Sequence, residues 1–215
     1  YDIAHAVSRL QQFNDKPTVS CMNAAVRVAS YVSCTDKFKL GGESVYGNSF
    51  TYYCDSDHAG DRQLTLRSHT GMIAFINNIP IHWRSKKQPK TVISPAMAEI
   101  YALGEAVKEF QWVNWQAEDL GIKPPSPFTV QVDNNQAISF KRNSCLNSKI
   151  RGCVDLRLDW VVGLRDEGVC KVMPVKGVRN PADLLTKCLV AKEFELKLSL
   201  CSACDALPWA GHCVI

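Results

Sequence analysis

The chain has 215 residues and a formal net charge of +4 at pH 7, with 46% hydrophobic and 21% charged residues, which is ordinary for a globular protein. No apolar run approaches the roughly 20 residues that a membrane-spanning helix needs, and no basic and then apolar signal segment opens the chain. The mild basic excess permits a nucleic-acid partner but does not require one.

The first forty residues predict a pair of amphipathic helices. Apolar residues recur at helical spacing through 2–13 and again through 19–33, and the helix breaker "NDKP" separates the two. The segment "LGGES" then marks a turn. Because the chain starts with Tyr1 rather than Met, we expect it to be a fragment of a longer protein.

From about residue 45 the periodicity changes to that of strands. The sequence predicts a first strand over 48–55 that ends at Asp55, a second over 71–76 and a third over 79–85. Asn77 and Asn78 predict a tight turn between the second and third strands. Pro80 favours an edge position for the third strand, because proline cannot donate to a ladder.

The clearest helix follows, with Ser94 as N-cap and Pro95 as its first residue. One apolar stripe runs along it, formed by Ala96, Ile100, Leu103, Val107, Phe110, Val113 and Ala117. Gly121 and "KPPSP" end this helix.

The remaining segments alternate between strand and helix patterns. We expect a fourth strand that stops at Asp133, a short helix through Phe140, a helix over about 153–167 capped by Gly168, and a fifth strand over 169–175. "RNPADLLTKCL" predicts the start of a last helix, with Asn180 as N-cap, Pro181 in the first position and Asp183 in the first turn. The order from 45 onward is βββ-α-β-α-(α)-β-α.

Four acids in this pattern are candidates for one site. Two predicted strands end in Asp, at Asp55 and Asp133, and neighbouring strand ends of an open sheet lie close together. Glu99 near a helix start and Asp183 in a helix first turn add two more carboxylates. Taken singly, each acid also fits a turn, a solvated helix position or a helix dipole, and Asp57 and Asp61 are expected to be turn or cap residues.

Together, the four acids predict a metal site. Ionised carboxylates at one spot repel one another and raise their pKa values, and divalent cations remove that repulsion. An all-oxygen ligand set selects magnesium or manganese. Two such ions roughly 4 Å apart activate a water and stabilise the leaving oxygen in a displacement at phosphorus.

The ten cysteines are scattered, and most lie in apolar runs, which predicts reduced, packed thiols in an intracellular protein. The tail "CSACDALPWAGHC" resembles a zinc set, with Cys201, Cys204, His212 and Cys213 as candidate ligands. Its adjacent His and Cys and its single CxxC are poor zinc-finger spacing. A loose apolar tail is the alternative interpretation.

Five segments resemble, in order, the signatures of the ribonuclease H domain of copia-type retrotransposon Pol polyproteins: "CDSDHAGD", "TGMIAFINNIPIHWRSKKQ", "AEIYALGEAVKE", "VDNNQAI" and "NPADLLTKCL". The match spans roughly 51–189. The two leading helices resemble the segment that joins the reverse transcriptase thumb to this domain. We therefore expect a helical segment over 1–40, a ribonuclease H-like domain over 45–190 and a divergent tail over 191–215.

The resemblance implies an α/β, ribonuclease H-like fold, with a five-stranded mixed sheet flanked by helices and the third strand at its edge. It also implies a catalytic, metal-binding quartet, which the motifs match to Asp55, Glu99, Asp133 and Asp183. The cofactor it implies is two Mg2+ ions, with Mn2+ possible.

The chain departs from the family pattern in three places. "SPAMAEI" stands for the usual "SSTEAEY", which changes the neighbourhood of Glu99 but keeps that residue. His58 replaces a common tryptophan. No histidine lies between Asp133 and Asp183, where many ribonucleases H have one, and this difference bears on turnover rate rather than on metal binding.

The implied substrate is an RNA·DNA hybrid, whose RNA strand is cut to leave a 3′-hydroxyl and a 5′-phosphate. Proteins recognise such hybrids largely by shape and 2′-hydroxyl contacts, and lysine and arginine contacts to phosphate make binding salt-dependent. The candidate nucleic-acid-binding residues are Arg84, Lys86, Lys87, Asn134, Asn135, Gln136, Lys141 and Arg142, with 144–151 beside them. A solvated basic edge is the alternative for the lysines and arginines.

The predicted function is a magnesium-dependent ribonuclease H of a retrotransposon reverse transcriptase. Its implied partner besides the hybrid is the polymerase domain of the same polyprotein, with no membrane, and its implied location is intracellular, in a cytoplasmic particle or the nucleus. A decayed or host-captured module that binds nucleic acid without cutting is one alternative. Another two-metal nuclease, such as an integrase or transposase, is disfavoured by the acid order and the "AE…ALGEA" helix.

Overall fold

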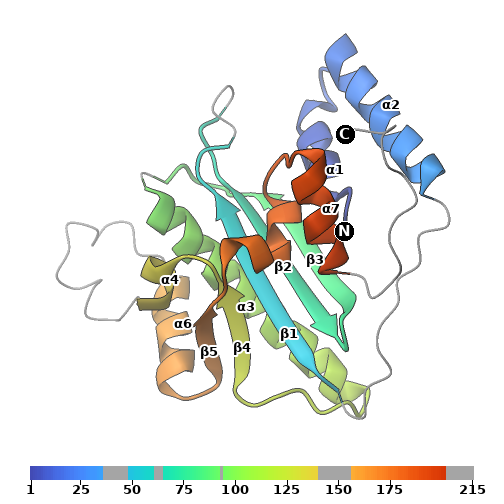
Figure 1. Cartoon of the computed structure of the whole chain (residues 1–215). Coiled ribbons are helices and arrows are strands. Elements are labelled where there is room, and N and C mark those ends of the chain that lie inside the picture. The colour runs from blue at the N-terminus through green and yellow to red at the C-terminus, as the bar shows by residue number, and fades with distance from the viewer. Residues whose placement is uncertain (36–47, 61–64, 93, 140–155, 202–215) are drawn as a thin grey trace.

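The computed structural model describes residues 1–35, 48–60, 65–92, 94–139 and 156–201 (Figure 1). Within these ranges five strands form one mixed sheet: β1 Phe50–Asp57, β2 His69–Ile76, β3 Ile79–Lys87, β4 Phe128–Val132 and β5 Cys170–Pro174. Their order is β3-β2-β1-β4-β5. The first three strands pair antiparallel, whereas β4 is parallel to both β1 and β5. The sheet confirms the predicted ribonuclease H-like fold, including the edge position of β3.

The hairpin between β2 and β3 turns at the predicted asparagines. Asn77 and Asn78 have φ angles of 50° and 63°, and two successive positive φ values are the requirement of the turn that matches strand twist. Asn77 also accepts a hydrogen bond from the Ser49 backbone N–H through its side-chain oxygen, at 2.8 Å. The turn is therefore anchored to the start of β1.

One face of the sheet is covered by α3 Pro95–Asp119, α4 Asn135–Ser139 and α6 Leu156–Asp166 (Figure 1). Ser94 caps α3 as predicted, since its hydroxyl accepts the Met97 backbone N–H at 3.3 Å. Side chains on a strand alternate between faces, so Tyr52 and Cys54 of β1 point into the core beneath α3. The structure describes α6 from Leu156 onward, and the predicted residues before it lie outside the described ranges.

The opposite face carries α1 Ala4–Leu10, α7 Ala191–Ser199 and three 3-10 turns, η1 Gln11–Phe13, η2 Gly177–Arg179 and η3 Pro181–Leu185. α2 Val19–Cys34 follows η1 and projects beyond the sheet (Figure 1). A second buried cluster lies on this face. Its members are Tyr1, Ile73, Phe75, Ala182, Leu184, Leu185, Leu198 and Cys201.

Two local expectations were wrong. β1 does not end at Asp55 but continues to Asp57, which pairs with His69 and accepts its backbone N–H, so Asp57 is a strand residue rather than a turn residue. The predicted last helix is a short 3-10 turn, η3. The Ser85 hydroxyl donates to the Leu185 carbonyl at 2.6 Å and holds this segment against the sheet.

The region after 190 contains a regular helix, α7, which the sequence did not predict. Its Leu198 is 1% exposed and packs in the second buried cluster with Tyr1. The proposed domain boundaries themselves stay predictions. Within the residues that the structure describes, none of the helices has the length and apolar character needed to cross a membrane.

Candidate metal centre

Three of the four predicted acids meet at one point. Asp55, Asp133 and Asp183 each offer a carboxylate oxygen, and these oxygens lie within 4.8 Å of one another. The register of β1 and β4 makes Asp55 and Asp133 neighbours, because Tyr53 pairs with Gln131 in their parallel ladder. Asp55 lies two residues after Tyr53, and Asp133 lies two residues after Gln131. Residues two apart along a strand point to the same face of the sheet.

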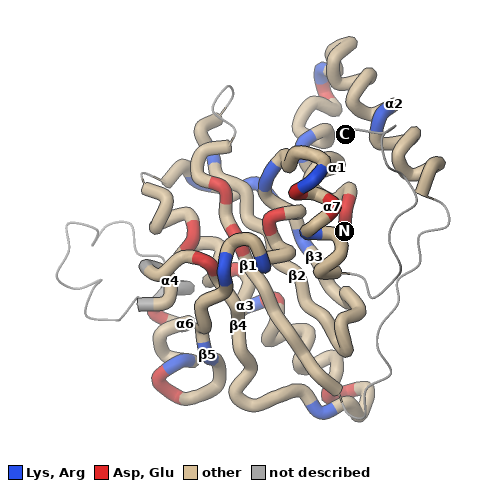
Figure 2. The backbone as a smooth tube through the Cα atoms, viewed as in Figure 1, with Lys and Arg blue, Asp and Glu red and all other residues tan. Residues whose placement is uncertain are grey.

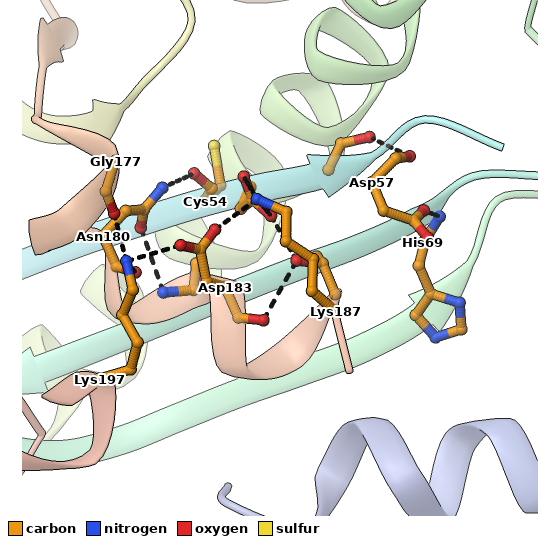
Figure 3. A network of polar contacts seen from close by, with 12 residues as sticks. Cys54, Asp57, His69, Gly177, Asn180, Asp183, Lys187 and Lys197 are labelled. Atoms are coloured by element: carbon orange, nitrogen blue, oxygen red, sulfur yellow. Dashed lines mark hydrogen bonds and ion pairs between the residues drawn. The ribbon is translucent and has the colours of Figure 1, made fainter. Parts of the chain in front are cut away.

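Asp183 reaches the same point because η3 is held down on β1 and β2. The side-chain amide of Asn180 donates to the Cys54 carbonyl at 3.0 Å, while its oxygen accepts the Ala182 backbone N–H at 3.1 Å (Figure 3). Beneath η3 lies Gly71. A Cβ at that position would be 2.7 Å from the Leu185 Cβ, so only glycine allows this approach.

Glu99 belongs to the same cleft but not to the group of three. It lies near the start of α3 and lines a cavity of about 770 Å³ together with Asp55, Asp133 and Lys187. Its Oε2 atom is buried and has no hydrogen-bond partner among the residues that the structure describes. Burial, followed by the negative charges of Asp55 and Asp133, raises the pKa of Glu99 to about 9. A buried acceptor without a donor is the kind of atom that a bound cation would satisfy.

The pKa values of Asp55 and Asp133 are shifted in the same direction. Burial raises the pKa of Asp55 to about 6, although Lys187 acts to lower it. Asp55 is fully buried, and its carboxylate accepts a hydrogen bond from the Thr186 hydroxyl. Burial also raises the pKa of Asp133 above its usual range. Without added cations, this cluster therefore resists full ionisation.

Two lysines approach Asp183 from opposite sides (Figure 3). The Lys187 Nζ is 2.6 Å from Asp183 Oδ1 and 3.2 Å from Asp55 Oδ2. The Lys197 Nζ is 2.6 Å from Asp183 Oδ2 and also donates to the backbone carbonyls of Gly177 and Asn180. Burial lowers the pKa of Lys187, but Asp55 and Asp183 raise it more, so the net shift is upward.

Sequence reasoning gave neither lysine a role. Lys187 follows Asp183 at the i,i+4 spacing, a separation at which opposite charges meet on a helical turn, so its pairing was readable from the sequence. Lys197 had no such signal because no helix was expected after 190. Acidic and basic positions consequently lie side by side around this part of the sheet, rather than forming a patch of one sign (Figure 2).

The donor set fits hard divalent cations. All the converging ligand atoms are carboxylate oxygens, which magnesium and manganese prefer over nitrogen or sulfur. Asp55, Asp133 and Asp183 are close enough to share an ion, and Glu99 supplies an unpartnered oxygen on the same cavity. The residues present therefore suit the metal chemistry that the sequence predicted.

The candidate nucleic-acid residues fall in three groups. Asn134 and Asn135 line the same cavity as the acids. The Gln136 side chain, Lys141, Arg142 and 144–151 lie outside what the structure describes. The third group lines a separate cavity of about 240 Å³ with Lys108 and comprises Arg84, Lys86 and Lys87.

Within the third group the charges differ in their surroundings. Arg84 is ion-paired with Glu109 of α3. The Lys87 Nζ donates to Gln12 Oε1 at 2.6 Å, which ties the end of β3 to the segment after α1. Lys86 is exposed on the edge strand. A phosphate-binding role for all three stays a prediction.

The candidate zinc set also stays untested. Cys201 is buried, and its thiol donates to the Lys197 carbonyl at 3.4 Å. Cys204, His212 and Cys213 lie outside the described residues. Cys201 is thus a packed thiol at the end of α7. Of the cysteines expected to be packed within apolar runs, Cys54 and Cys170 are buried, whereas Cys34 and Cys188 are exposed.

No protein-family model matches the chain. The retrovirus-related Pol polyprotein from transposon TNT 1-94 of Nicotiana tabacum is 30% identical over 197 residues, which are 91% of this chain and 14% of that protein. The Pol polyprotein from transposon RE1 of Arabidopsis thaliana is 29% identical over 194 residues, which are 90% of this chain and 13% of that protein. The chain therefore spans a small part of the length of these relatives.

Two further similarities are shorter or weaker. Secreted RxLR effector protein 161 of Plasmopara viticola is 34% identical over 112 residues, which are 52% of this chain and 78% of that protein. Among solved structures, LC11-RNase H1 isolated from compost aligns with a TM-score of 0.47 at 15% identity and covers 65% of this chain and 93% of that one. The sequence similarity, not this structural alignment, relates the chain to known proteins.

Proposed function

This chain belongs to the retrovirus-related Pol polyproteins of transposons, of which it matches one segment, and from that premise we propose that it is a ribonuclease that cuts the RNA strand of RNA·DNA hybrids. The observation that carries the proposal is the convergence of Asp55, Asp133 and Asp183 within 4.8 Å. Asp55 comes from β1, Asp133 from the residue after β4 and Asp183 from a separate turn. Packing alone gives no reason to bring three acids together with two of them buried, because burial of carboxylates is costly unless they are compensated.

In this proposal the four acids hold two Mg2+ ions, or Mn2+ in their place. The bound ions would supply an activated water and stabilise the leaving oxygen. Asp55 and Asp133 provide fixed oxygens on the sheet, Glu99 provides its unpartnered oxygen from α3, and Asp183 closes the site from η3. Because these elements are packed on both faces of the sheet, the ligand positions are set before substrate arrives.

The hybrid would lie across the cavity of the acids. Asn134 and Asn135, which line this cavity, would hydrogen-bond the sugar edge, with Gln136 next to them in sequence. Lys86 and Lys87, then Arg84, would contact phosphates along β3, and Lys141 and Arg142 would extend the same role. Such contacts recognise the backbone and the 2′-hydroxyl groups rather than base sequence.

The proposal includes the setting of the domain. Since the polyprotein relatives are several times longer than the matched segment, we expect a polymerase domain in the same polyprotein as its partner. An intracellular location, in a cytoplasmic particle or the nucleus, would follow from reverse transcription of a transposon.

A second candidate is a module that binds nucleic acid without cutting. It is supported by the similarity to a shorter protein, the RxLR effector, of which the chain covers 78%. The Lys187 ammonium at the carboxylates is also compatible with a site that no longer takes metal. Retention of all four acids favours the nuclease.

The test is cleavage of a hybrid labelled on its RNA strand, with Mg2+, beside a metal-free reaction and a double-stranded DNA control. Metal-dependent cutting of the RNA strand alone is the expected result. If the folded protein cuts nothing with either Mg2+ or Mn2+, the nuclease proposal fails and the second candidate stands.

A further inference from the structure

Resting on the proposed metal-dependent function, we propose that Lys187 is a tethered internal cation. Its ammonium group occupies the carboxylate cluster in the metal-free protein, and a divalent ion must displace it in order to bind. Lys187 would thus set the metal affinity of the site and hold the site together before metal arrives.

The contacts of Lys187 are those of a counter-ion. Its Nζ lies 2.6 Å from Asp183 Oδ1 and 3.2 and 3.3 Å from the two oxygens of Asp55. One ammonium therefore joins a carboxylate on β1 to a carboxylate on η3, two elements that are far apart in sequence. Asp55 and Asp183 repel each other when both are ionised, so a shared positive charge between them stabilises their approach.

The same oxygens are the proposed metal ligands. Asp55 and Asp183 belong to the group of three acids whose oxygens lie within 4.8 Å of one another. A metal cation bound by these atoms would compete with the Lys187 ammonium group for the same carboxylates. The two are also like charges, so they repel each other. Occupation by one therefore weakens occupation by the other, which is a linkage between two ligands of a single site.

Lys187 is able to leave, whereas Lys197 is not. The Lys187 side chain is 38% exposed and lines the cavity of about 770 Å³, so its flexible stem has open space into which it can swing. The Lys197 side chain is 6% exposed and is held by Asp183 and by the carbonyls of Gly177 and Asn180. Lys197 therefore fixes the position of Asp183, and Lys187 is the exchangeable charge.

Acylation of the wild-type protein with an amine-reactive reagent measures this exchange directly. Labelling of each lysine is quantified by mass spectrometry in EDTA and in saturating Mn2+, at one pH and ionic strength. We expect labelling of Lys187 to rise several-fold with Mn2+ because its ammonium is released to solvent. Lys197 and the exposed Lys171 serve as internal controls whose labelling stays constant. Unchanged labelling of Lys187 while Mn2+ is bound overturns the inference.

Mn2+ binding, followed by the electron paramagnetic resonance signal of the free ion, tests the affinity. We expect Lys187→Met and Lys187→Gln to bind Mn2+ at least about tenfold more tightly than wild type, since no buried ion pair has to be broken. Lys187→Arg keeps the charge and should stay near wild type. Lys197→Met should bind more weakly because Asp183 loses its anchor, and Lys171→Met should match wild type.

The outcomes separate this inference from the proposed function. Equal Mn2+ affinity in wild type, Lys187→Met and Lys187→Gln overturns the role of Lys187 and leaves the metal site standing. Binding by the charge-removing variants but not by wild type supports the inference in its strongest form. Absence of Mn2+ binding in wild type and every Lys187 variant overturns the metal site of the proposed function, and the inference with it.

Discussion

Gly71 lies directly opposite Asp55 in the antiparallel ladder of β1 and β2. A Cβ on Gly71 would lie 2.7 Å from both the Leu185 Cβ and the Thr186 Cγ2 and 2.8 Å from the Ala182 carbonyl oxygen. The turn η3, which carries Asp183, therefore rests on the bare backbone across from Asp55. Because glycine has no side chain, Gly71 allows Asp55 and Asp183 to approach each other closely.

We expect Gly71→Ala to lower the free energy of unfolding by about 1–3 kcal/mol, the usual range for overpacking a well-packed interior. Because the added methyl pushes η3 away from β1, Mn2+ affinity should fall as well. Urea unfolding and Mn2+ titration measure the two effects. The matched control is Gly163→Ala on α6, where a Cβ meets nothing within 4 Å; there alanine should be neutral or stabilise by up to about 1 kcal/mol. Equal stability of the Gly71 variant and wild type would contradict the packing argument.

Asp133→Asn should abolish hybrid cleavage while the protein stays folded. The substitution removes a proposed metal ligand, and it also removes a negative charge that raises the pKa values of Asp55 and Glu99. We expect the cleavage rate to fall by more than about 100-fold, the order lost when one well-placed electrostatic group is removed from an active site. The rate constant with Mg2+ is compared with that of Asp119→Asn, at the exposed end of α3. A variant that cuts as fast as wild type would remove Asp133 from the site.

Stability of the metal-free protein should fall as pH rises. The pKa of Glu99 is about 9 in the folded protein against an ordinary value of 4.5, so between these values the folded state binds more protons than the unfolded state. Linkage then requires the free energy of unfolding to decrease with pH across that window. The pKa of Asp55, raised from 3.8 to about 6, adds to the decrease at its lower end.

Urea unfolding in EDTA at a series of pH values measures this slope. Asp55, Asp133 and Lys187 all act on Glu99, so the variant to compare is Glu99→Gln, which removes the group and leaves its neighbours in place. We expect wild type to lose at least about 1.4 kcal/mol more than Glu99→Gln between pH 5 and 9, the equivalent of a single pK unit. If the free energies of unfolding of the two proteins depend on pH in the same way, Glu99 is not held in its protonated form by burial.

The sequence predicted those features of the site that depend on local patterns. Strand alternation and the proline at position 80 predicted the sheet and its edge, and the motifs predicted the acids on β1, after β4 and on η3. Residues that carry no motif and reach the site only through tertiary contacts were not predicted. Lys197 lies in α7, and no motif or capping residue in the sequence predicted that helix. Lys197 contacts Asp183 because the neighbouring Leu198 packs against the sheet.

The wrong end of β1 has a similar cause. A run that stops at an acid was interpreted as a strand end, yet hydrogen bonding to β2 continues through Asp57 and His69. Hydrogen bonding between the backbones of two strands can continue past a charged side chain when that charge has a hydrogen-bond or ion-pair partner. Asp55 is compensated by Thr186 and Lys187, both of which lie more than a hundred residues later. No local pattern carries that information.

The basic residues of β3 should not contribute equally to hybrid binding. Arg84 is already paired with Glu109 and Lys87 donates to Gln12, whereas Lys86 is exposed. A lysine that neutralises a phosphate releases about one counter-ion, so its removal reduces the salt dependence of binding by roughly one contact. An arginine whose charge is already balanced by a carboxylate should release less.

We therefore expect Lys86→Ala to weaken hybrid binding about equally for all sequences and to reduce the slope of log K against log salt by roughly 0.7–0.9. Arg84→Ala should change the slope less, because Arg84 is already paired with Glu109 and its contact with phosphate would release fewer counter-ions. Fluorescence anisotropy in EDTA, at several salt concentrations, measures binding without cleavage, and Lys123→Ala beyond the far end of α3 is the control. If Lys86→Ala leaves the slope unchanged while Arg84→Ala lowers it, the hybrid contacts β3 through the buried side of this cavity, and Glu109 must give up its partner on binding.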